Sequence, residues 1–315
     1  DSFSKSVQLG AGLEKTGRLS RGSMTRTIQA LRICQQKLRK HRVKHMRLVA
    51  TEACRRATNA DEFIKRVQRE TGLRLEIIPP KEEARLAAIS CAPLVNKKTE
   101  NLLVVDIGGG STELVWIDMS QVPKRDRPHS IMQLETGFAR SNKSIPSARV
   151  VDWISVPLGV ATLRDQFNDV EDDGARFALM SWFFEENLSS FAPYHDEKAR
   201  ERFQIVGTSG TVTTVAASHL GLKRYDRTKV DGLRMSSVQI DKVIQSYLEM
   251  GPTGRRADPR IGQDRQALIM SGAAILQALM RCWPTDRLSV ADRGLREGLL
   301  YAQMSADGVL ERGAL

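Results

Sequence analysis

Residues 106–113 combine side chains suited to binding phosphate and a metal ion. Asp106 and Glu113 flank three glycines, a serine and a threonine. Glycine lacks a Cβ atom, so an anion can approach the backbone, and successive N–H groups and two hydroxyls can surround its oxygens. The alternative is a tight hairpin that binds nothing. The candidate phosphate-binding residues are Gly108, Gly109, Gly110, Ser111 and Thr112.

The two acids of this segment point to a metal. Mg²⁺ is usually held by one or two carboxylates, by waters and by the substrate. Asp106 stands at a strand end beside the expected phosphate oxygens, so we expect it to associate with Mg²⁺. Glu113 is either a second functional carboxylate or a solvent-facing strand residue.

A second glycine-rich loop follows the predicted strand 203–206. It could present backbone N–H groups at the N-terminus of a helix to an anion. The alternative is ordinary helix capping by Thr211. The candidate residues are Gly207, Thr208, Ser209, Gly210 and Thr211.

The first third of the chain offers two further candidates. Glu82 and Glu83 lie in the first turn of a helix that two prolines open. The helix dipole favours carboxylates there, so position alone favours a structural role. Arg55 and Arg56 follow a strand end, where a guanidinium either clamps a phosphate or is merely solvated.

The hydrophobic spacing predicts an α/β alternation around these candidates. A helix is expected over residues 23–40 with Ser23 as its N-cap. Residues 102–107 and 112–117 are predicted to be two strands, so the first glycine loop is a hairpin tip, unlike a P-loop or Rossmann turn. Two further strands are expected over residues 46–51 and 73–78, and an extended loop is expected over residues 120–150. One further helix is expected over residues 61–71, between Asn59 and Gly72, and another begins at residue 79. The remaining helices are expected near residues 158–167, 175–191, 237–250, 264–280 and 294–303.

The composition indicates a soluble globular protein. A chain of 315 residues with 41% hydrophobic residues can bury a sizeable core. No apolar run reaches the roughly 20 residues that span a bilayer, and the first residues do not resemble a secretory signal. We therefore expect a cytoplasmic protein with no membrane partner. The four cysteines and five histidines lack the spacing of a metal site.

The formal net charge of +11 is unevenly distributed. Residues 1–99 contain 22 Lys and Arg against 9 Asp and Glu, whereas residues 100–315 contain 26 against 28. Such a basic field suits a polyanionic partner, although a solvated helix face is an equal alternative. Stacking aromatics are not interleaved with the basic residues, which weakens a single-stranded nucleic-acid interpretation.

Five segments in order carry a family resemblance: residues 50–59 (ATEACRRATN), 81–86 (KEEARL), 105–114 (VDIGGGSTEL), 207–211 (GTSGT) and 294–300 (GLREGLL). On these motifs nearly the whole chain resembles the exopolyphosphatase and guanosine pentaphosphate phosphohydrolase (Ppx/GppA) family. The resemblance implies a two-domain α/β fold of the actin/hexokinase-like (ribonuclease H-like) type with the active site in the interdomain cleft. It divides the chain into domain I (1–99), domain II (100–292) and a C-terminal helix (293–315) that returns to domain I.

The resemblance also implies roles by motif position. Glu83 corresponds to the catalytic base, Glu113 to the carboxylate that orients the attacking water, and Asp106 to the Mg²⁺-associated acid. Arg55 corresponds to a phosphate-binding arginine. The resemblance thereby reverses the structural interpretation of Glu83. The implied chemistry is in-line attack of water on a terminal phosphoryl group, with catalysis through positioning and charge neutralisation.

The sequence also departs from the family pattern. In the family, a strand and a phosphate loop of the type Asp-x-Gly-Ser-Asn-Ser precede the segment that matches residues 1–4, and both are absent from this sequence. Pro79, Pro80 and Lys81 stand where the family more often has Ser-Gly before the acidic pair. The extra C-terminal domain of longer members is also missing, so we do not expect processive hydrolysis of long chains.

These observations predict an exopolyphosphatase that releases orthophosphate from linear polyphosphate, with conversion of pppGpp to ppGpp as an alternative or second activity. A kinase of the same fold would need an acceptor-sugar pocket that the sequence does not indicate. A non-catalytic sensor that binds polyphosphate or (p)ppGpp is the rival from a different class. No nucleic-acid partner is required, and a homodimer is an option because family members often dimerise.

Overall fold

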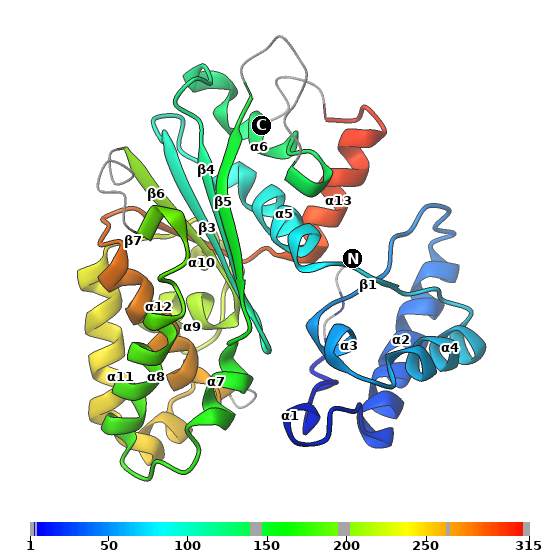
Figure 1. The fold of residues 1–315 in the computed structure, drawn as a ribbon, viewed down its shortest axis with the longest axis horizontal. Helices are drawn as coiled ribbons and strands as arrows, with labels where there is room; N and C mark the ends of the chain where they lie inside the picture. The colour runs from blue at the N-terminus through cyan, green and yellow to red at the C-terminus, as the bar shows by residue number, and fades with distance from the viewer. Residues whose placement is uncertain (1–2, 4, 139–146, 195–201, 263–264, 311–315) are drawn as a thin grey trace. The chain divides into compact units, whose positions relative to one another are not determined.

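The structure is a computed structural model that describes residues 3, 5–138, 147–194, 202–262 and 265–310. These residues form two compact units, Asp1–Pro80 and Lys81–Leu315 (Figure 1). The domain boundaries that the family resemblance implies, after residues 99 and 292, stay a prediction. Within the described ranges, no helix is both long enough and apolar enough to cross a membrane.

The first unit packs its helices around an apolar core beside a short parallel strand pair, β1 and β2. Met24 and Ile28 of one helix meet Phe63 and Val67 of another in this core. The described elements are α1 (Leu13–Thr16), α2 (Arg21–Lys40), β1 (Val49–Ala50), α3 (Glu52–Arg56), α4 (Ala60–Thr71) and β2 (Glu76–Ile77).

The start of α2 corrects one prediction. Ser20, and not Ser23, is the N-cap: its hydroxyl accepts a hydrogen bond from the Ser23 N–H at 3.1 Å. Ser23 lies inside the helix and is buried. The predicted helix between Asn59 and Gly72 is confirmed, and Gly72 ends α4 in the left-handed conformation that glycine adopts most easily.

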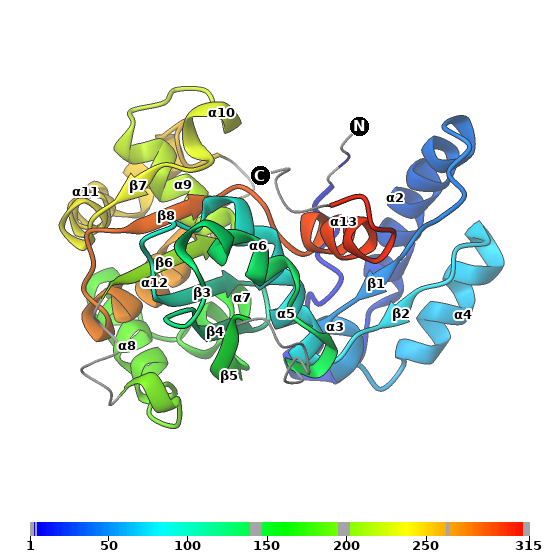
Figure 2. The same cartoon turned by 90° about the horizontal axis from the view of Figure 1, so that it is seen from above.

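In its described residues, the second unit is built on a six-stranded sheet with the strand order β5-β4-β3-β6-β8-β7 (Figure 2). β3, β6 and β8 run parallel, while β4, β5 and β7 are antiparallel to their neighbours. The predicted hairpin around the first glycine loop is confirmed as β3 and β4. The strands are β3 (Asn101–Ile107), β4 (Thr112–Asp118), β5 (Arg149–Val156), β6 (Phe203–Thr208), β7 (Arg234–Met235) and β8 (Leu288–Ala291).

Helices cover both faces of this sheet. Alternate residues of β3 point to opposite faces, and on each face they are buried against these helices. Leu103 and Val105 pack toward α7 (Val160–Gln166), α8 (Asp173–Glu186), α9 (Gly210–His219), α11 (Ser237–Ala257) and α12 (Ile269–Cys282). Leu102 and Val104 pack toward α5 (Pro80–Cys91), α6 (Arg127–Met132) and α13 (Leu295–Ala306).

The contact between α5 and α13 is unusually close. A Cβ atom added to Gly298 would lie 2.0 Å from the carbonyl oxygen of Leu86. Only glycine therefore fits at this helix crossing. α13 thus packs directly against α5, the helix that begins with the acidic pair.

The extended loop predicted over residues 120–150 is wrong in its described part. α6 begins at Arg127, with Pro128 in its first turn, and β5 begins at Arg149. The polar composition concealed that Ile131 and Met132 are buried against the α5 side of the sheet. Residues 139–146 lie outside the described residues. The strands β7 and β8 were not predicted, and the helix expected from residue 264 begins at Ile269.

Candidate active site

Polar side chains form a row across the sheet beside the first glycine loop. Ser155 of β5 lies opposite Glu113 of β4, Glu113 lies opposite Asp106 of β3, and Asp106 is in register with Thr208 of β6. Residues directly opposite one another share a face of the sheet. Asp106 follows Val104 by two positions, so this row lies on the face that α5 covers.

The first turn of α5 brings a third carboxylate to this row. Burial raises the pKa of Asp106 well above its ordinary value, and the negative charges of Glu113 and Glu83 raise it further. Glu83 must therefore lie close enough for its charge to act on Asp106. The second unit alone thus brings together the three carboxylates that the sequence singled out.

Fixed contacts hold this turn of α5 in place. Glu82 and Arg85 form a buried pair with two hydrogen bonds of 2.7 and 2.8 Å, and Arg85 also donates to the Leu134 carbonyl at 2.8 Å. The Lys81 ammonium lies 5.9 Å from the centre of the Trp153 ring on β5. Glu82 therefore has the structural role that its position favoured.

The backbone of the glycine loop is held on its carbonyl side. The carbonyls of Gly108 and Gly109 accept hydrogen bonds from the Val160 and Ala161 N–H groups of α7, at 3.0 and 2.8 Å. In the described part of the chain, the N–H groups of residues 109–111 have no acceptor. Successive N–H groups of this kind form a cradle for an anion.

The two hydroxyls of the loop are engaged within the protein. Ser111 donates to Glu113 at 2.7 Å, and Thr112 donates to the Leu158 carbonyl at 2.7 Å. The sequence suggested that both hydroxyls surround phosphate. In the folded chain they support the loop and the carboxylate, and the loop's open donors are backbone N–H groups.

The second glycine loop leads into α9, and its N-cap differs from the one that the alternative interpretation of this loop supposed. Ser209, and not Thr211, caps this helix, since its hydroxyl accepts from the Thr211 and Val212 N–H groups at 3.1 Å. Its backbone has φ 156° and ψ 169°, a conformation normally restricted to glycine. Thr208 donates to the Arg293 carbonyl. The loop is thus strained and fixed by its own side chains.

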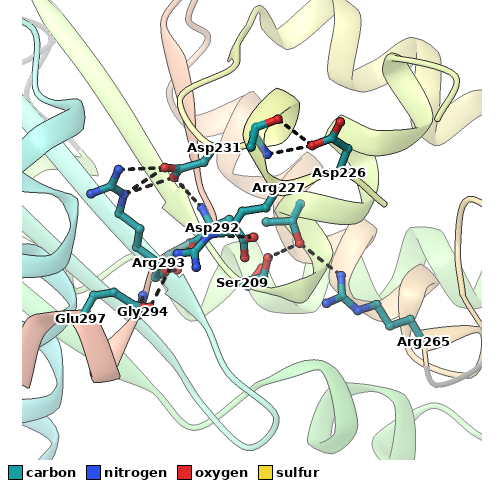
Figure 3. A network of polar contacts seen from close by, with 12 residues as sticks. Ser209, Asp226, Arg227, Asp231, Arg265, Asp292, Arg293, Gly294 and Glu297 are labelled. Atoms are coloured by element: carbon teal, nitrogen blue, oxygen red, sulfur yellow. Dashed lines mark hydrogen bonds and ion pairs between the residues drawn. The ribbon is translucent and has the colours of Figure 1, made fainter. Parts of the chain in front are cut away.

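Charged residues enclose this second loop from two sides (Figure 3). Arg265 donates to the Gly210 carbonyl and to the Thr214 hydroxyl. On the other side, the guanidinium of Arg293 pairs with Asp231 at 2.8 Å. These contacts place a guanidinium at the N-terminus of α9.

Residues of both glycine loops line one cavity of about 240 Å³. Its polar wall includes Arg265 and backbone of both loops, and its apolar wall comes from α7 and α12. The two predicted phosphate loops therefore share one space. The lining residues are Ile107, Gly108, Gly109, Val160, Gly210, Thr211, Arg265, Leu268 and Ile269.

A family model described as the Ppx/GppA phosphatase family matches residues 2–307. The chain belongs to this family. It is 29% identical over 300 residues to guanosine-5'-triphosphate,3'-diphosphate pyrophosphatase from Aeromonas hydrophila. The match covers 94% of this chain and 52% of that protein. The chain thus spans about half the length of the curated relatives it matches.

Solved Ppx/GppA structures have the same fold. The Aquifex aeolicus family member is 31% identical with a TM-score of 0.72, and the match covers 96% of this chain and 87% of that one. An exopolyphosphatase-like protein is 27% identical with a TM-score of 0.77, covering 96% and 91%. These similarities confirm the actin/hexokinase-like α/β fold.

Not every functional residue expected of a Ppx/GppA member lies in the described site of the second unit. Arg55 belongs to the first unit, where it donates to Glu52 at 2.9 Å and to the Ile78 carbonyl at 2.9 Å. Its role in binding phosphate stays a prediction.

Sequence reasoning missed three residues near the loops: Ser155, Gly159 and Arg265. A Cβ atom on Gly159 would lie 2.5 Å from the Gly108 carbonyl oxygen, so glycine is needed there. Pro157 and Gly159, which follow β5, were a weak sequence signal for this close approach. Arg265 had none, because only the fold brings it to residue 210.

The residues at the row suit a divalent cation, although Mg²⁺ itself stays a prediction. Within the ranges that the structure describes, no group of three or more His, Cys, Asp or Glu residues is arranged to hold a metal alone. Mg²⁺ needs only one or two carboxylates when a substrate phosphate supplies further oxygens. Burial, and then the negative charges of Glu113 and Glu83, raise the pKa of Asp106, and a bound cation would favour its ionised form.

Val160→Pro tests the support of the glycine loop. Val160 is the first residue of α7, where proline is tolerated, and Gly159 before it has an extended backbone that suits a following proline. The change deletes the N–H group that holds the Gly108 carbonyl and replaces the Val160 side chain, which lines the cavity. We expect about a fivefold rise in KM for the phosphate substrate, as for the loss of one hydrogen bond of about 1 kcal/mol. Val160→Ala keeps the N–H group and should leave KM unchanged; equal KM values for both variants would contradict this role.

Proposed function

We propose that this chain hydrolyses the terminal phosphoanhydride bond of linear polyphosphate and releases orthophosphate, with conversion of pppGpp to ppGpp as an alternative or second activity. The observation that carries this proposal is the placement of Glu83, Glu113 and Asp106 beside a loop whose N–H groups have no acceptor among the described residues. Membership of a phosphatase family supports it.

In the proposed reaction, the N–H groups of residues 109–111 bind oxygens of the terminal phosphoryl group. Glu83 accepts the proton of the attacking water, and Glu113 orients that water. Mg²⁺ held by Asp106 would neutralise charge on the phosphate oxygens when bound. Most of the rate enhancement then comes from positioning and charge neutralisation, because phosphoryl transfer needs little covalent help from the protein.

Two observations favour different substrates. The Aeromonas relatives are named as pyrophosphatases of guanosine-5'-triphosphate,3'-diphosphate, which supports pppGpp. The charge distribution supports a longer polyanion: residues 1–80 contain 18 Lys and Arg against 7 Asp and Glu, while residues 81–315 contain 30 of each. We give polyphosphate precedence because the whole net positive charge of the chain lies in the first unit, where it would attract a long polyanion.

Phosphate release from the purified protein tests the proposal. Polyphosphate and pppGpp are supplied separately with Mg²⁺, and release from either one supports hydrolysis. Tight binding of one of them without any release would instead favour a sensor of the same fold.

A basic segment at the end of α2 allows a second test. Residues 39–46 are all exposed, and Arg39, Lys40, Arg42 and Lys44 have no ion pair within the described chain. We expect that changing all four to Gln weakens binding of long-chain polyphosphate about tenfold, at up to about 1 kcal/mol per exposed charge pair. Binding measured by titration should also become less sensitive to salt.

A matched control removes the same charge elsewhere. Gln at the exposed residues Lys97, Lys98, Lys124 and Lys242 of the second unit should change binding of the long chain less than twofold. Equal losses in both variants would mean that only net charge matters, and would contradict a specific role for the α2 segment.

A further inference from the structure

We propose that Ser155 is a positioning residue that fixes the carboxylate of Glu113 for the reaction. This inference rests on the proposed function and adds a residue that lies outside the segments singled out in the sequence. Its hydroxyl donates to Glu113 Oε1 at 2.9 Å. None of the five segments that carry the family resemblance includes it, since it comes from β5, 42 residues further along the chain.

The geometry gives Ser155 a different task from Ser111. Both hydroxyls donate to the same oxygen, Oε1 of Glu113, at 2.9 and 2.7 Å. Ser111 belongs to the glycine loop, whereas Ser155 is directly opposite Glu113 in the β4–β5 ladder. A cross-strand pair of this kind has a short, fixed separation between its Cβ atoms. Ser155 therefore holds the carboxylate to the sheet independently of the loop.

Burial makes this hydrogen bond important. Glu113 is 2% exposed, and a carboxylate without water needs protein donors to offset the cost of its burial. Loss of the Ser155 donor would let the carboxylate leave the orientation in which it can direct a water molecule.

The same strand also holds the helix that bears Glu83. Trp153 lies two residues before Ser155, and successive alternate residues of a strand share a face. The Trp153 ring contacts the ammonium of Lys81, two residues before Glu83. β5 thus contacts α5 and β4, which are two of the three elements that carry the carboxylates, and the Ser155 hydroxyl is its side-chain hydrogen bond to Glu113.

A double-mutant cycle tests this role. We expect Ser155→Ala to lower kcat at least tenfold with KM changed less than twofold, and Ser155→Thr, which keeps a hydroxyl, to restore most of kcat. In the background of Glu113→Gln, Ser155→Ala should have little further effect, because the group that it positions is gone. An equal loss of kcat in both backgrounds, or no loss in the wild-type background, would overturn the proposal.

A buried serine remote from the loops provides the control. Ser181 donates to the Ala274 carbonyl at 3.0 Å, so Ser181→Ala loses a buried hydroxyl without touching Glu113. It should leave kcat unchanged, and a loss equal to that of Ser155→Ala would contradict a specific effect.

A crystal structure of Ser155→Ala separates this proposal from the proposed function. We expect the Glu113 carboxylate to move by about 1 Å or to occupy two rotamers. An unmoved carboxylate would refute the positioning role even in an active enzyme. Absence of phosphate release from the wild-type protein would refute the proposed function while leaving this structural result intact.

Discussion

Glu83→Gln should lower kcat by well over a hundredfold while the protein keeps its fold. Glutamine preserves the size of the side chain but cannot accept the proton of the attacking water. A hundredfold loss corresponds to about 2.7 kcal/mol of transition-state stabilisation. Steady-state release of phosphate, with a thermal melting curve of the same preparation, measures both quantities. Near wild-type turnover would remove Glu83 from the role of base.

The neighbouring acid is the natural control for this variant. Glu82 is buried against Arg85, so Glu82→Gln leaves a buried guanidinium without its counter-charge. Breaking such a pair costs up to about 3–5 kcal/mol. We therefore expect Glu82→Gln to lower the melting temperature markedly, in contrast to Glu83→Gln. The same pattern of loss for both variants would mean that Glu83 is also structural.

Asp106→Asn should abolish hydrolysis and yet stabilise the metal-free protein at neutral pH. Burial and the charges of Glu113 and Glu83 raise the pKa of Asp106, so the folded chain keeps this proton at pH values where the unfolded chain has lost it. The free energy of unfolding therefore falls as the pH rises above the ordinary carboxyl pKa of about 4. Asparagine removes this dependence. With EDTA at pH 7–8, we expect a melting temperature about 2–4 °C higher, as for about 1 kcal/mol.

Metal and pH provide the further readouts. The difference between Asp106→Asn and the wild type should shrink as the pH is lowered to the ordinary carboxyl pKa of about 4 and below, where the wild-type carboxyl becomes protonated in the unfolded chain as well as in the folded one. Mg²⁺ should stabilise the wild type and not the variant, because a ligand of the folded state raises stability only where it binds. Equal stabilisation of both by Mg²⁺ would place the metal elsewhere.

Asp118 on the same hairpin supplies a control of opposite sign. Burial raises its pKa, but hydrogen bonds from Ser120 and Arg149 outweigh that effect and lower it overall. Its ionised form is therefore stabilised in the folded protein. Asp118→Asn should lower the melting temperature at neutral pH, and that loss should disappear at pH values below the lowered pKa.

The periodic elements could be predicted from the sequence because their signals are local. The glycine hairpin, the helix between Asn59 and Gly72 and the proline-opened α5 each have flanking residues that define them. α6 and β8 were missed for a different reason. Both are short, at six and four residues, and their burial depends on packing against distant parts of the sheet, which no local pattern reports.

The candidate site shows the same division. The residues of each loop were recognisable from their types and spacing, and the family resemblance assigned Glu83 where helix-dipole reasoning preferred a structural role. Ser155 and Arg265 could not be found this way, because their hydrogen-bond partners are distant in the sequence. Ser155 is 42 residues from Glu113, and Arg265 is 55 residues from Gly210. The engagement of the Ser111 and Thr112 hydroxyls within the protein was likewise invisible before the fold placed their acceptors.

The hydrogen bonds from α7 to the glycine loop determine which way its peptide groups face. In a trans peptide the C=O and the N–H point in opposite directions. The carbonyls of Gly108 and Gly109 are fixed by Val160 and Ala161, so the N–H groups of Gly109 and Gly110 must face away from α7. The donors of the loop are thus oriented before any anion arrives. Binding would then require little reorganisation of the backbone, which makes the loop a preorganised dipolar receptor and α7 its template.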